Sequence, residues 1–346
     1  MTSSGDGDTR LPTMADVARR AGVSATTVSF VINDRRDQAI SEGTRARVLA
    51  AVEELGYRPN RAAQGLKTRR TDTLGFINHE RPGEPLAGPL LSGAHDAAWE
   101  WGSALVVVNT DHGEARLRTA VDELLDRRVD GIIVAAVGTR PVTVPSLLRG
   151  TPALLVNMLP DDDRVPVLLP DEYHGGEAAA RMLLEAGHTN IALLSGIETS
   201  WATQERLRGH LDALQEAGVD ASRQFHAYGG YDAASGHALT RRLLATAEVP
   251  TAIVCGNDRM ALGALLALAE SGLQVPRDVS LVGYDDQPLL ASEMQPPLST
   301  VELPYYAMGR WAADHLLSGA VPALPARTYL PCRAIPRGSV RDLRNH

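Results

Sequence analysis

The sequence predicts a small all-α head followed by an α/β body made of two doubly wound parallel-sheet halves. Three observations lead to this fold class. Residues 13–56 contain three short helical patterns separated by turn signals. From Thr73 onward, two successive series of short apolar runs alternate with helical stretches. The chain of 346 residues is also long enough for two or three domains, at roughly 100–200 residues per domain.

The composition is that of a folded protein, with 44% hydrophobic and 22% charged residues. No apolar run approaches the roughly 20 residues of a membrane span. The polar first residues lack the basic start and apolar stretch of a secretory signal. Two cysteines, Cys255 and Cys332, are too few for a disulfide framework or a thiolate metal cage. We therefore expect a cytoplasmic protein without a cofactor, a bound metal or a membrane partner.

Charge is divided unevenly along the chain. Between Thr9 and Thr71 there are 12 Lys and Arg residues against 6 Asp and Glu residues, a local charge of +6. The whole chain carries −8, so the remainder carries −14. A basic head on an acidic body indicates an anionic partner for the head. A merely solvated charged surface is the alternative.

The head is predicted to span residues 12–58, after a disordered tail at residues 1–11. Its first helix follows Thr13, which with Asp16 forms an N-cap signal, and it ends before Gly22. Ser24 and Ser41 can cap the second and third helices. The first two helices and their short glycine turn form a helix-turn-helix, whose second helix would enter the major groove of DNA. A plain three-helix cap is the alternative.

Several motifs in this head resemble the lactose-repressor/galactose-repressor (LacI/GalR) family of transcription factors. The resemblance is dense from Thr13 to about Gly75 and weaker to about Leu330. It is carried by Ala15-Asp16-Val17-Ala18, Ala21-Gly22-Val23-Ser24, Thr27-Val28-Ser29, Ile32-Asn33 and Gly56-Tyr57-Arg58-Pro59-Asn60.

The resemblance implies that Ala25, Thr26 and Phe30 contact bases. Many family members have arginine where this chain has Phe30. An aromatic ring cannot make a bidentate contact to guanine but can pack on a thymine methyl group. Positions that match phosphate-contacting or capping residues are Thr13, Ser24, Thr27, Ser29, Asn33, Ser41, Thr44, Tyr57 and Asn60.

A hinge is predicted at residues 59–72. The segment Arg61–Lys67 is too short for a helix that is stable alone, so we expect it to fold on DNA. By resemblance, Ala63 and Leu66 lie at the minor groove, and Leu66 wedges between base pairs and kinks the duplex. The alternative is that Leu66 packs on its dimer partner. Arg69 and Arg70 should add salt-sensitive phosphate affinity.

The body is predicted at residues 73–340. Apolar runs without alternation indicate parallel strands that are buried on both faces, with a ligand cleft at their carboxyl ends. Late strands at Val301–Tyr306 and Arg327–Cys332 imply that the chain recrosses. We assign residues 73–170 and 303–326 to the first half and residues 171–302 and 327–340 to the second. The expected strands are Leu74–Ile77, Ala104–Asn109, Gly131–Val137, Ala153–Asn157, Ile191–Ser195, Phe225–Tyr228, Ala252–Cys255 and Val279–Gly283.

Polar residues follow several of these strands. The resemblance implies that Arg206, Asn257 and Asp285 bind an effector and that Tyr231 is an aromatic pocket residue; Asp171 and His79 are looser matches. Trp201 lies in the loop before Arg206 and offers a second aromatic face. Guanidinium, amide and carboxylate groups beside aromatic rings suit a polyhydroxyl ligand. Asn257 could instead simply cap a helix, and His79 could be an exposed loop residue.

The architecture is shared with periplasmic sugar-binding proteins and with the regulatory domain of the LacI/GalR family. The resemblance implies a homodimeric DNA-binding regulator, most often a repressor, with an inverted-repeat double-stranded operator and a nucleoid location when bound. We expect a sugar effector, and hence control of carbohydrate-use genes, because Leu86 and Ala87 stand where aromatic residues are common.

The sequence also leaves other effectors and functions as alternatives to this prediction. A purine or other metabolite is the alternative effector, and a solute-binding protein is a distant alternative function, since it would have no use for the head. The sequence contains no Gly-x-Ser-x-Gly elbow, no Walker-type loop and no metal-spaced histidine pair. We therefore do not expect an enzyme.

Overall fold

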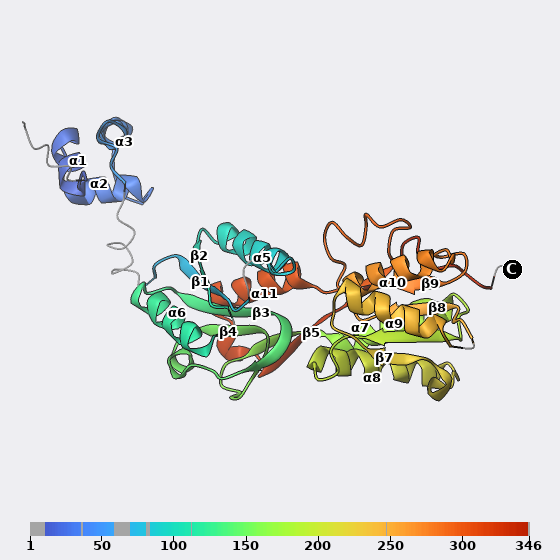
Figure 1. Ribbon diagram of the computed structural model, residues 1–346. Coiled ribbons are helices and arrows are strands. Elements are labelled where there is room, and N and C mark those ends of the chain that lie inside the picture. The colour runs from blue at the N-terminus through green and yellow to red at the C-terminus, as the bar shows by residue number, and fades with distance from the viewer. Residues whose placement is uncertain are drawn as a thin grey trace, which may run out of the picture. The chain divides into compact units, whose positions relative to one another are not determined.

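The computed structural model describes residues 11–35, 37–58, 70–80, 84–111, 113–246 and 248–344 (Figure 1). The chain forms two compact units, residues 1–71 and 72–346. The predictions for the tail at residues 1–10 and for Asn60, Ala63 and Leu66 fall outside the described residues. No helix of the described residues is both long enough and apolar enough to cross a membrane.

The head consists of three helices, α1 (Met14–Ala21), α2 (Ala25–Ile32) and α3 (Glu42–Leu55). Thr13 and Asp16 form a capping box at α1, and Ser24 and Ser41 cap α2 and α3. Gly22 and Gly56 end α1 and α3 with left-handed backbones, φ 67° and 60°, which glycine adopts without steric cost. The predicted helix-turn-helix is confirmed. Its core contains Val17, Ala18, Ala21, Val28, Val31, Val48, Ala51 and Tyr57.

The first half of the body is built on a parallel sheet. Its described strands have the order β11-β5-β4-β3-β1-β2, with parallel pairing throughout. The strands are β1 (Thr73–Asn78), β2 (Ala104–Asn109), β3 (Gly131–Val142), β4 (Ala153–Pro160), β5 (Val167–Asp171) and β11 (Arg327–Pro331). Helices α5 (Ala87–Glu100), α6 (Glu114–Asp126) and α11 (Tyr305–Leu317) cover it, with short 3-10 turns at Ser146–Gly150 and Val321–Ala323.

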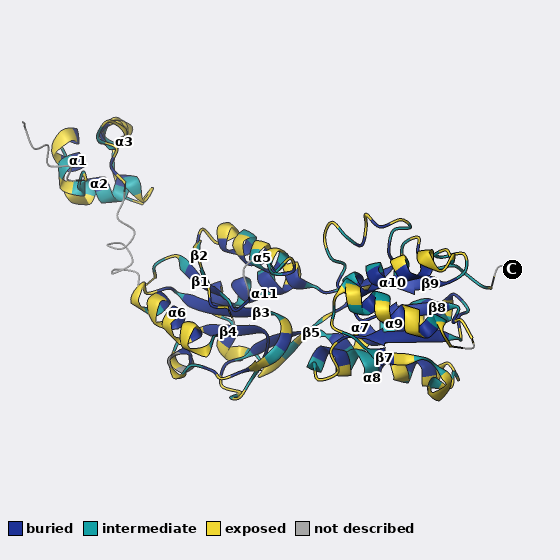
Figure 2. Ribbon diagram, in the orientation of Figure 1, coloured by how far each residue is buried: buried dark blue, intermediate teal, exposed yellow. Residues whose placement is uncertain are grey.

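Alternate residues of these strands face opposite helices. Leu74 and Phe76 pack in the cluster that contains α5 and α11, whereas Ile77 packs in the cluster that contains α6. Both faces of the sheet are therefore buried, as Figure 2 shows in dark blue. This double burial explains why the strands of the sequence carry unbroken apolar runs.

The second half has the strand order β7-β6-β8-β9, also parallel, among its described residues. Helices α7 and α8 pack on one face and α9 and α10 on the other. The elements are α7 (Glu172–Glu185), β6 (Ile191–Ser195), α8 (Trp201–Glu216), the turn Ala221–Arg223, β7 (His226–Tyr228), α9 (Ala233–Leu244), β8 (Ala252–Cys255), α10 (Asp258–Glu270), β9 (Ser280–Val282), β10 (Thr300–Glu302) and β12 (Arg333–Ile335). Strands β10 and β12 form an antiparallel pair. Two doubly wound halves are thus confirmed.

Three details of the predicted body were wrong. The sequence did not predict strand β5, which is buried except at its last residue, Asp171. The strand expected at Val301–Tyr306 is only β10, because α11 begins at Tyr305 after Pro304. The segment Arg327–Pro331 was assigned to the second half, but as β11 it pairs with β5 in the first sheet. Only β12 continues into the second half, where it pairs with β10.

Candidate functional site

The exposed face of α2 carries the residues predicted to contact bases. Ala25 and Thr26 are exposed and Phe30 is half-buried. Ser24 accepts the Thr27 backbone N–H at 3.1 Å, and its hydroxyl lies 2.9 Å from the Thr27 hydroxyl. A helix with small, polar side chains on its outward face can approach DNA closely. The DNA contacts themselves remain predictions.

The residues predicted at the DNA backbone have different surroundings. Ser41 and Thr44 repeat the Ser24–Thr27 geometry at α3, with a backbone bond of 3.2 Å. Asn33 donates to the Ser29 carbonyl at 2.8 Å, and Thr13 belongs to the capping box. Tyr57 is only 8% exposed and packs in the core of the head. Its ring therefore has a packing role whatever its hydroxyl contacts.

Arg206 is the centre of a buried charged group in the body. Its Nε and Nη2 donate to the two Glu172 carboxylate oxygens at 2.7 and 2.9 Å, and its Nη1 donates to the Gly256 carbonyl at 2.7 Å. The guanidinium lies 3.6 Å from the centre of the Tyr284 ring, whose hydroxyl donates to Glu172 at 2.9 Å. Burial alone would lower the pKa of Arg206, but the Glu172 carboxylate, together with Tyr284 and Tyr231, more than offsets it and raises that pKa well above its usual value.

Two further carboxyl groups complete this group, which we call the Arg206 cluster: Glu172, Arg206, Asp258, Tyr284 and Asp285. Asp285 is 7% exposed and lies 3.9 Å from Arg206 Nη1. Burial raises the pKa of Asp285 well above its usual value, although Arg206 acts against this. Asp258 accepts from the Thr300 hydroxyl and the Gln287 backbone N–H, both at 2.7 Å, and burial raises its pKa to about 7.

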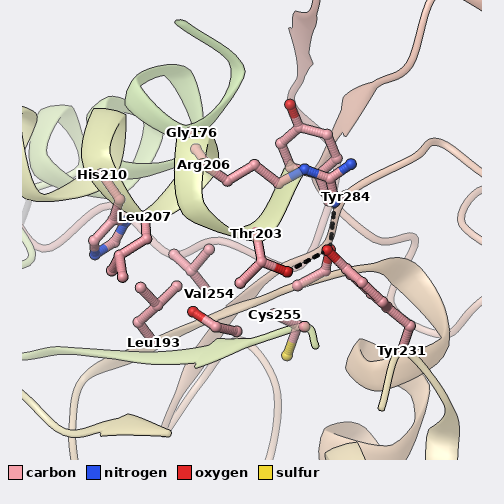
Figure 3. A pocket seen from close by; sticks show the side chains of 14 residues that line it. Gly176, Leu193, Thr203, Arg206, Leu207, His210, Tyr231, Val254, Cys255 and Tyr284 are labelled. Carbon is pink, nitrogen blue, oxygen red and sulfur yellow. Dashed lines mark hydrogen bonds between the residues drawn. The ribbon is translucent and has the colours of Figure 1, made fainter. Parts of the chain in front are cut away.

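Tyr231 and Asn257 lie next to this cluster. Asn257 caps α10 by accepting the Met260 N–H at 2.9 Å, and it donates to the Tyr231 carbonyl at 3.0 Å. The Tyr231 hydroxyl lies 2.6 Å from the Thr203 hydroxyl (Figure 3). The Tyr231 ring covers Gly196 so closely that a Cβ atom there would collide with it. Arg206, Asn257, Asp285 and Tyr231 are thus brought together, after the carboxyl ends of strands as predicted.

The other predicted site residues have partners elsewhere. Trp201 begins α8 and packs against the α6-side core of the first half. Asp171 caps α7 and lies 2.7 Å from Nδ1 of His174. His79 is buried rather than exposed, with Nδ1 2.6 Å from the Thr110 hydroxyl. Leu86 packs in the core of the first half, so it gives no support to the argument for a wider pocket wall.

Some residues of the site were not predicted. Glu172 begins α7, where acidic residues usually only match the helix dipole. Asn157, in β4, donates to the Tyr305 hydroxyl at 3.3 Å. Burial, then the carboxylates of Asp285 and Glu172, raise the pKa of Tyr305, so the first half contributes to the electrostatics of the cluster. The polar Asn157 at the end of an apolar run was the available signal.

Left-handed backbones mark the same region. Asn157, Tyr231 and Asp285 have φ values of 60°, 64° and 105°. Side chains other than glycine rarely adopt such angles, and when they do they cluster at functional sites. Beside them, a pocket opens under α8, between the Arg206 cluster and strands β6 and β8. The backbone angles and the pocket locate the candidate ligand site in the same place.

A helix-turn-helix head joined to a two-halved ligand-binding body defines the class of ligand-controlled DNA-binding regulators. Residues 13–60 match the family described as "Bacterial regulatory proteins, lacI family", and residues 180–340 match the "Periplasmic binding protein-like domain". The chain belongs to the lacI family and is a DNA-binding transcriptional regulator.

Individual proteins resemble the chain over most of its length. The "Ribose operon repressor" of Escherichia coli K12 is 35% identical over 309 residues, covering 89% of this chain and 92% of the relative. The "HTH-type transcriptional repressor PurR" of Pectobacterium atrosepticum is 33% identical over 310 residues, covering 89% and 90%. A solved Lac repressor dimer bound to operator and the anti-inducer ONPF is 31% identical, with a TM-score of 0.78, covering 96% of this chain and all of that one.

Proposed function

We propose that the protein is a repressor that binds an inverted-repeat operator as a homodimer and is controlled by a neutral sugar bound at the Arg206 cluster. The observation that carries the effector class is the pairing of Arg206 with Glu172. Glu172 already neutralises the charge of the Arg206 guanidinium. Asp285 and Asp258 add carboxyl groups to the cluster and no further cation. An anionic ligand would therefore meet carboxyl groups and no unmatched cation, whereas sugar hydroxyls can donate to the carboxyl groups and accept from Arg206.

Relatives bearing the names of a ribose operon repressor and of PurR leave two effector classes to separate. A thermal unfolding panel of monosaccharides, disaccharides, sugar phosphates and purines separates them. A ligand at 100 times its Kd adds about 2.7 kcal/mol to the state that it binds, so a hit raises Tm by several degrees. We expect a neutral sugar to give this shift and its phosphate ester to give none. A purine hit, or a response to the phosphate ester alone, would overturn the sugar assignment.

A pair of conservative variants places the ligand. Arg206→Lys keeps the charge but loses the bidentate pairing with Glu172, so the sugar-induced shift should disappear. Arg208→Lys, two residues along α8, changes an exposed arginine that pairs with Glu205 and should respond like the wild type. Equal responses from the two variants would remove Arg206 from the binding site.

Exposed apolar side chains support the dimer. Trp99 and Val107 are exposed on α5 and β2 in the first half, and Leu266 and Leu289 are exposed on and after α10 in the second. In Figure 1, α5 and α10 lie along the same edge of the body. A contiguous apolar patch, unlike single scattered residues, commonly marks an interface, and we expect these residues to be covered in the dimer. The Lac repressor structure to which the chain is similar is described as a dimer bound to operator.

The operator is tested by selecting DNA from a random pool with the full-length protein. A two-fold dimer should select an inverted repeat, because it presents two recognition helices. Leu66→Ala should then weaken operator binding several-fold without changing the sugar-induced thermal shift, because the wedge contacts DNA alone. Salt-sensitive binding without sequence preference would contradict the operator, and unchanged affinity of Leu66→Ala would contradict the wedge.

A further inference from the structure

The pocket under α8 extends from the Arg206 cluster along strands β6 and β8 within the second half. Its lining includes Tyr231, Thr203 and Gly256, which belong to the site already described. The rest of the lining is largely apolar and includes Leu207, Leu193 and Val254. Figure 3 shows His210 and Leu207 pointing from α8 toward these strand residues.

His210 is a polar residue of this lining. It lies one helical turn after Arg206 and is 2% exposed, and neither Nδ1 nor Nε2 has a hydrogen-bond partner among the residues that the structure describes. Burial, with a smaller contribution from His226, lowers the pKa of His210 to about 4. The neutral ring offers one N–H donor and one acceptor nitrogen. Buried polar atoms in native proteins are nearly always paired, so this ring calls for a partner other than the described residues, such as a ligand or a water molecule.

The other polar groups of the pocket are already engaged. The Ser195 hydroxyl lies 2.9 Å from Nε2 of His226, and the Thr203 hydroxyl is paired with Tyr231. Arg206, the charged residue of the lining, is neutralised by Glu172. The pocket therefore favours a neutral guest whose hydroxyl groups can both donate and accept.

We propose that this pocket is a subsite for a hydroxyl-bearing arm of the effector and that His210 is a specificity-determining residue. The His210 N–H donates to a hydroxyl oxygen, and the unprotonated nitrogen accepts a hydroxyl proton. This proposal rests on the proposed sugar effector. Water has the same hydroxyl chemistry, and the experiment below separates the two sources.

The test titrates ribose, galactose and cellobiose, with their monodeoxy analogues, into full-length wild type, His210→Leu and the control His237→Leu. His237 is a partly exposed histidine of α9 that pairs with Glu270. For a sugar that binds wild type, we expect His210→Leu to lose affinity about tenfold or more, the size of a hydrogen bond lost inside a pocket. One monodeoxy analogue should bind wild type about tenfold more weakly than its parent sugar does. The same analogue should bind His210→Leu as strongly as the parent sugar does. His237→Leu should bind as wild type does.

Each other outcome has a definite meaning. Undiminished sugar affinity in His210→Leu overturns the subsite and assigns the ring to water, while the proposed sugar effector stands. If none of the probes binds wild type, these sugars fail as effectors and the subsite falls with them. Should His210→Leu fold poorly by circular dichroism, His210→Asn supplies a donor and an acceptor of smaller size. It should retain more sugar affinity than His210→Ala, and equal losses in these two variants overturn the proposal.

Discussion

Arg206 and Glu172 form a charged pair whose two side chains are almost entirely removed from water. The sequence predicted Arg206 through its position after a strand and through a family resemblance. It could not predict Glu172, which lies 34 residues earlier at the start of another helix. Pairing across such a separation is set by tertiary packing. Local sequence therefore located the cation but not the anion that determines its chemistry.

Replacing Glu172 with glutamine should destabilise the body strongly, because the buried Arg206 charge would lose its counter-ion. The expected loss is about 3–5 kcal/mol in the free energy of unfolding, measured by urea denaturation. Glu177→Gln, on the same helix, breaks an exposed pair with Arg181 and should cost about 1 kcal/mol or less. Similar losses for the two variants would contradict the pairing described here.

His210 should make stability depend on pH. Its pKa is lowered to about 4 in the folded state but is about 6.5 in an unfolded chain. The unfolded state therefore binds a proton first, and the His210 contribution to stability is lost as pH falls from about 6.5 towards 4. Asp258, with its raised pKa, has the opposite sign, since its effect destabilises the fold as pH rises.

The His210 effect is isolated by comparing wild type with His210→Leu. In urea denaturation, the variant should gain on the order of 2–3 kcal/mol relative to wild type between pH 7.5 and pH 4.5. The Asp258 effect is common to both proteins and cancels in the difference. A difference that does not change with pH would mean that His210 is solvated or paired.

Each half of the body is held together by helices that meet at glycines. In three helix pairs, a Cβ atom at a glycine on either helix would collide with a backbone carbonyl of the other. These glycines are Gly93 and Gly309 in α5 and α11, Gly176 and Gly209 in α7 and α8, and Gly236 and Gly263 in α9 and α10. The pair α7–α8 thereby places Glu172 beside Arg206.

Two glycines in α5 should respond in opposite ways to alanine. Gly93→Ala would force α5 away from the Tyr306 carbonyl of α11 and should cost about 1–3 kcal/mol, as overpacking usually does. Gly88→Ala meets no neighbouring atom and should be neutral or stabilise by up to about 1 kcal/mol, since alanine favours helix. Thermal unfolding of the two variants checks this, and a Gly93→Ala protein as stable as Gly88→Ala would show that the helices can separate freely.

Elements with strong local signals were predicted well. The capping residues Thr13, Ser24 and Ser41 fixed the helix starts of the head, because the cap is a local interaction. The strand β5 was missed, since its five residues end in Pro170 and Asp171 and resemble a loop boundary. β11 was given to the wrong half because no local feature of a strand states which sheet it will join.

At the scale of the whole molecule, α8 connects the candidate ligand site to both halves. Trp201, at its first turn, packs on the core of the first half. Arg206 holds the cluster and His210 lines the pocket beneath. A ligand that moves α8 would therefore change contacts in both halves. The charge division between residues 9–71 and the rest of the chain separates this machinery from the part that binds DNA.

That division of charge predicts how the two binding activities respond to salt. If two heads contact about six phosphates, operator affinity should fall about a thousandfold between 50 and 200 mM salt. Sugar binding should change little, because the proposed ligand is neutral and the charges of the Arg206 cluster are buried. Both affinities can be measured on the same full-length protein, with the operator obtained by selection.

Single arginine substitutions should affect the salt dependence of operator binding in the head but not in the body. Arg70→Gln, in the basic stretch between Thr9 and Thr71, should reduce the slope of log affinity against log salt concentration by about one for each phosphate contact removed. Arg181→Gln, which breaks pairs with Glu177 and Glu216 in the body, should leave the slope unchanged. If Arg181→Gln lowers the salt slope as much as Arg70→Gln does, the acidic body also takes part in binding DNA, and not the basic head alone.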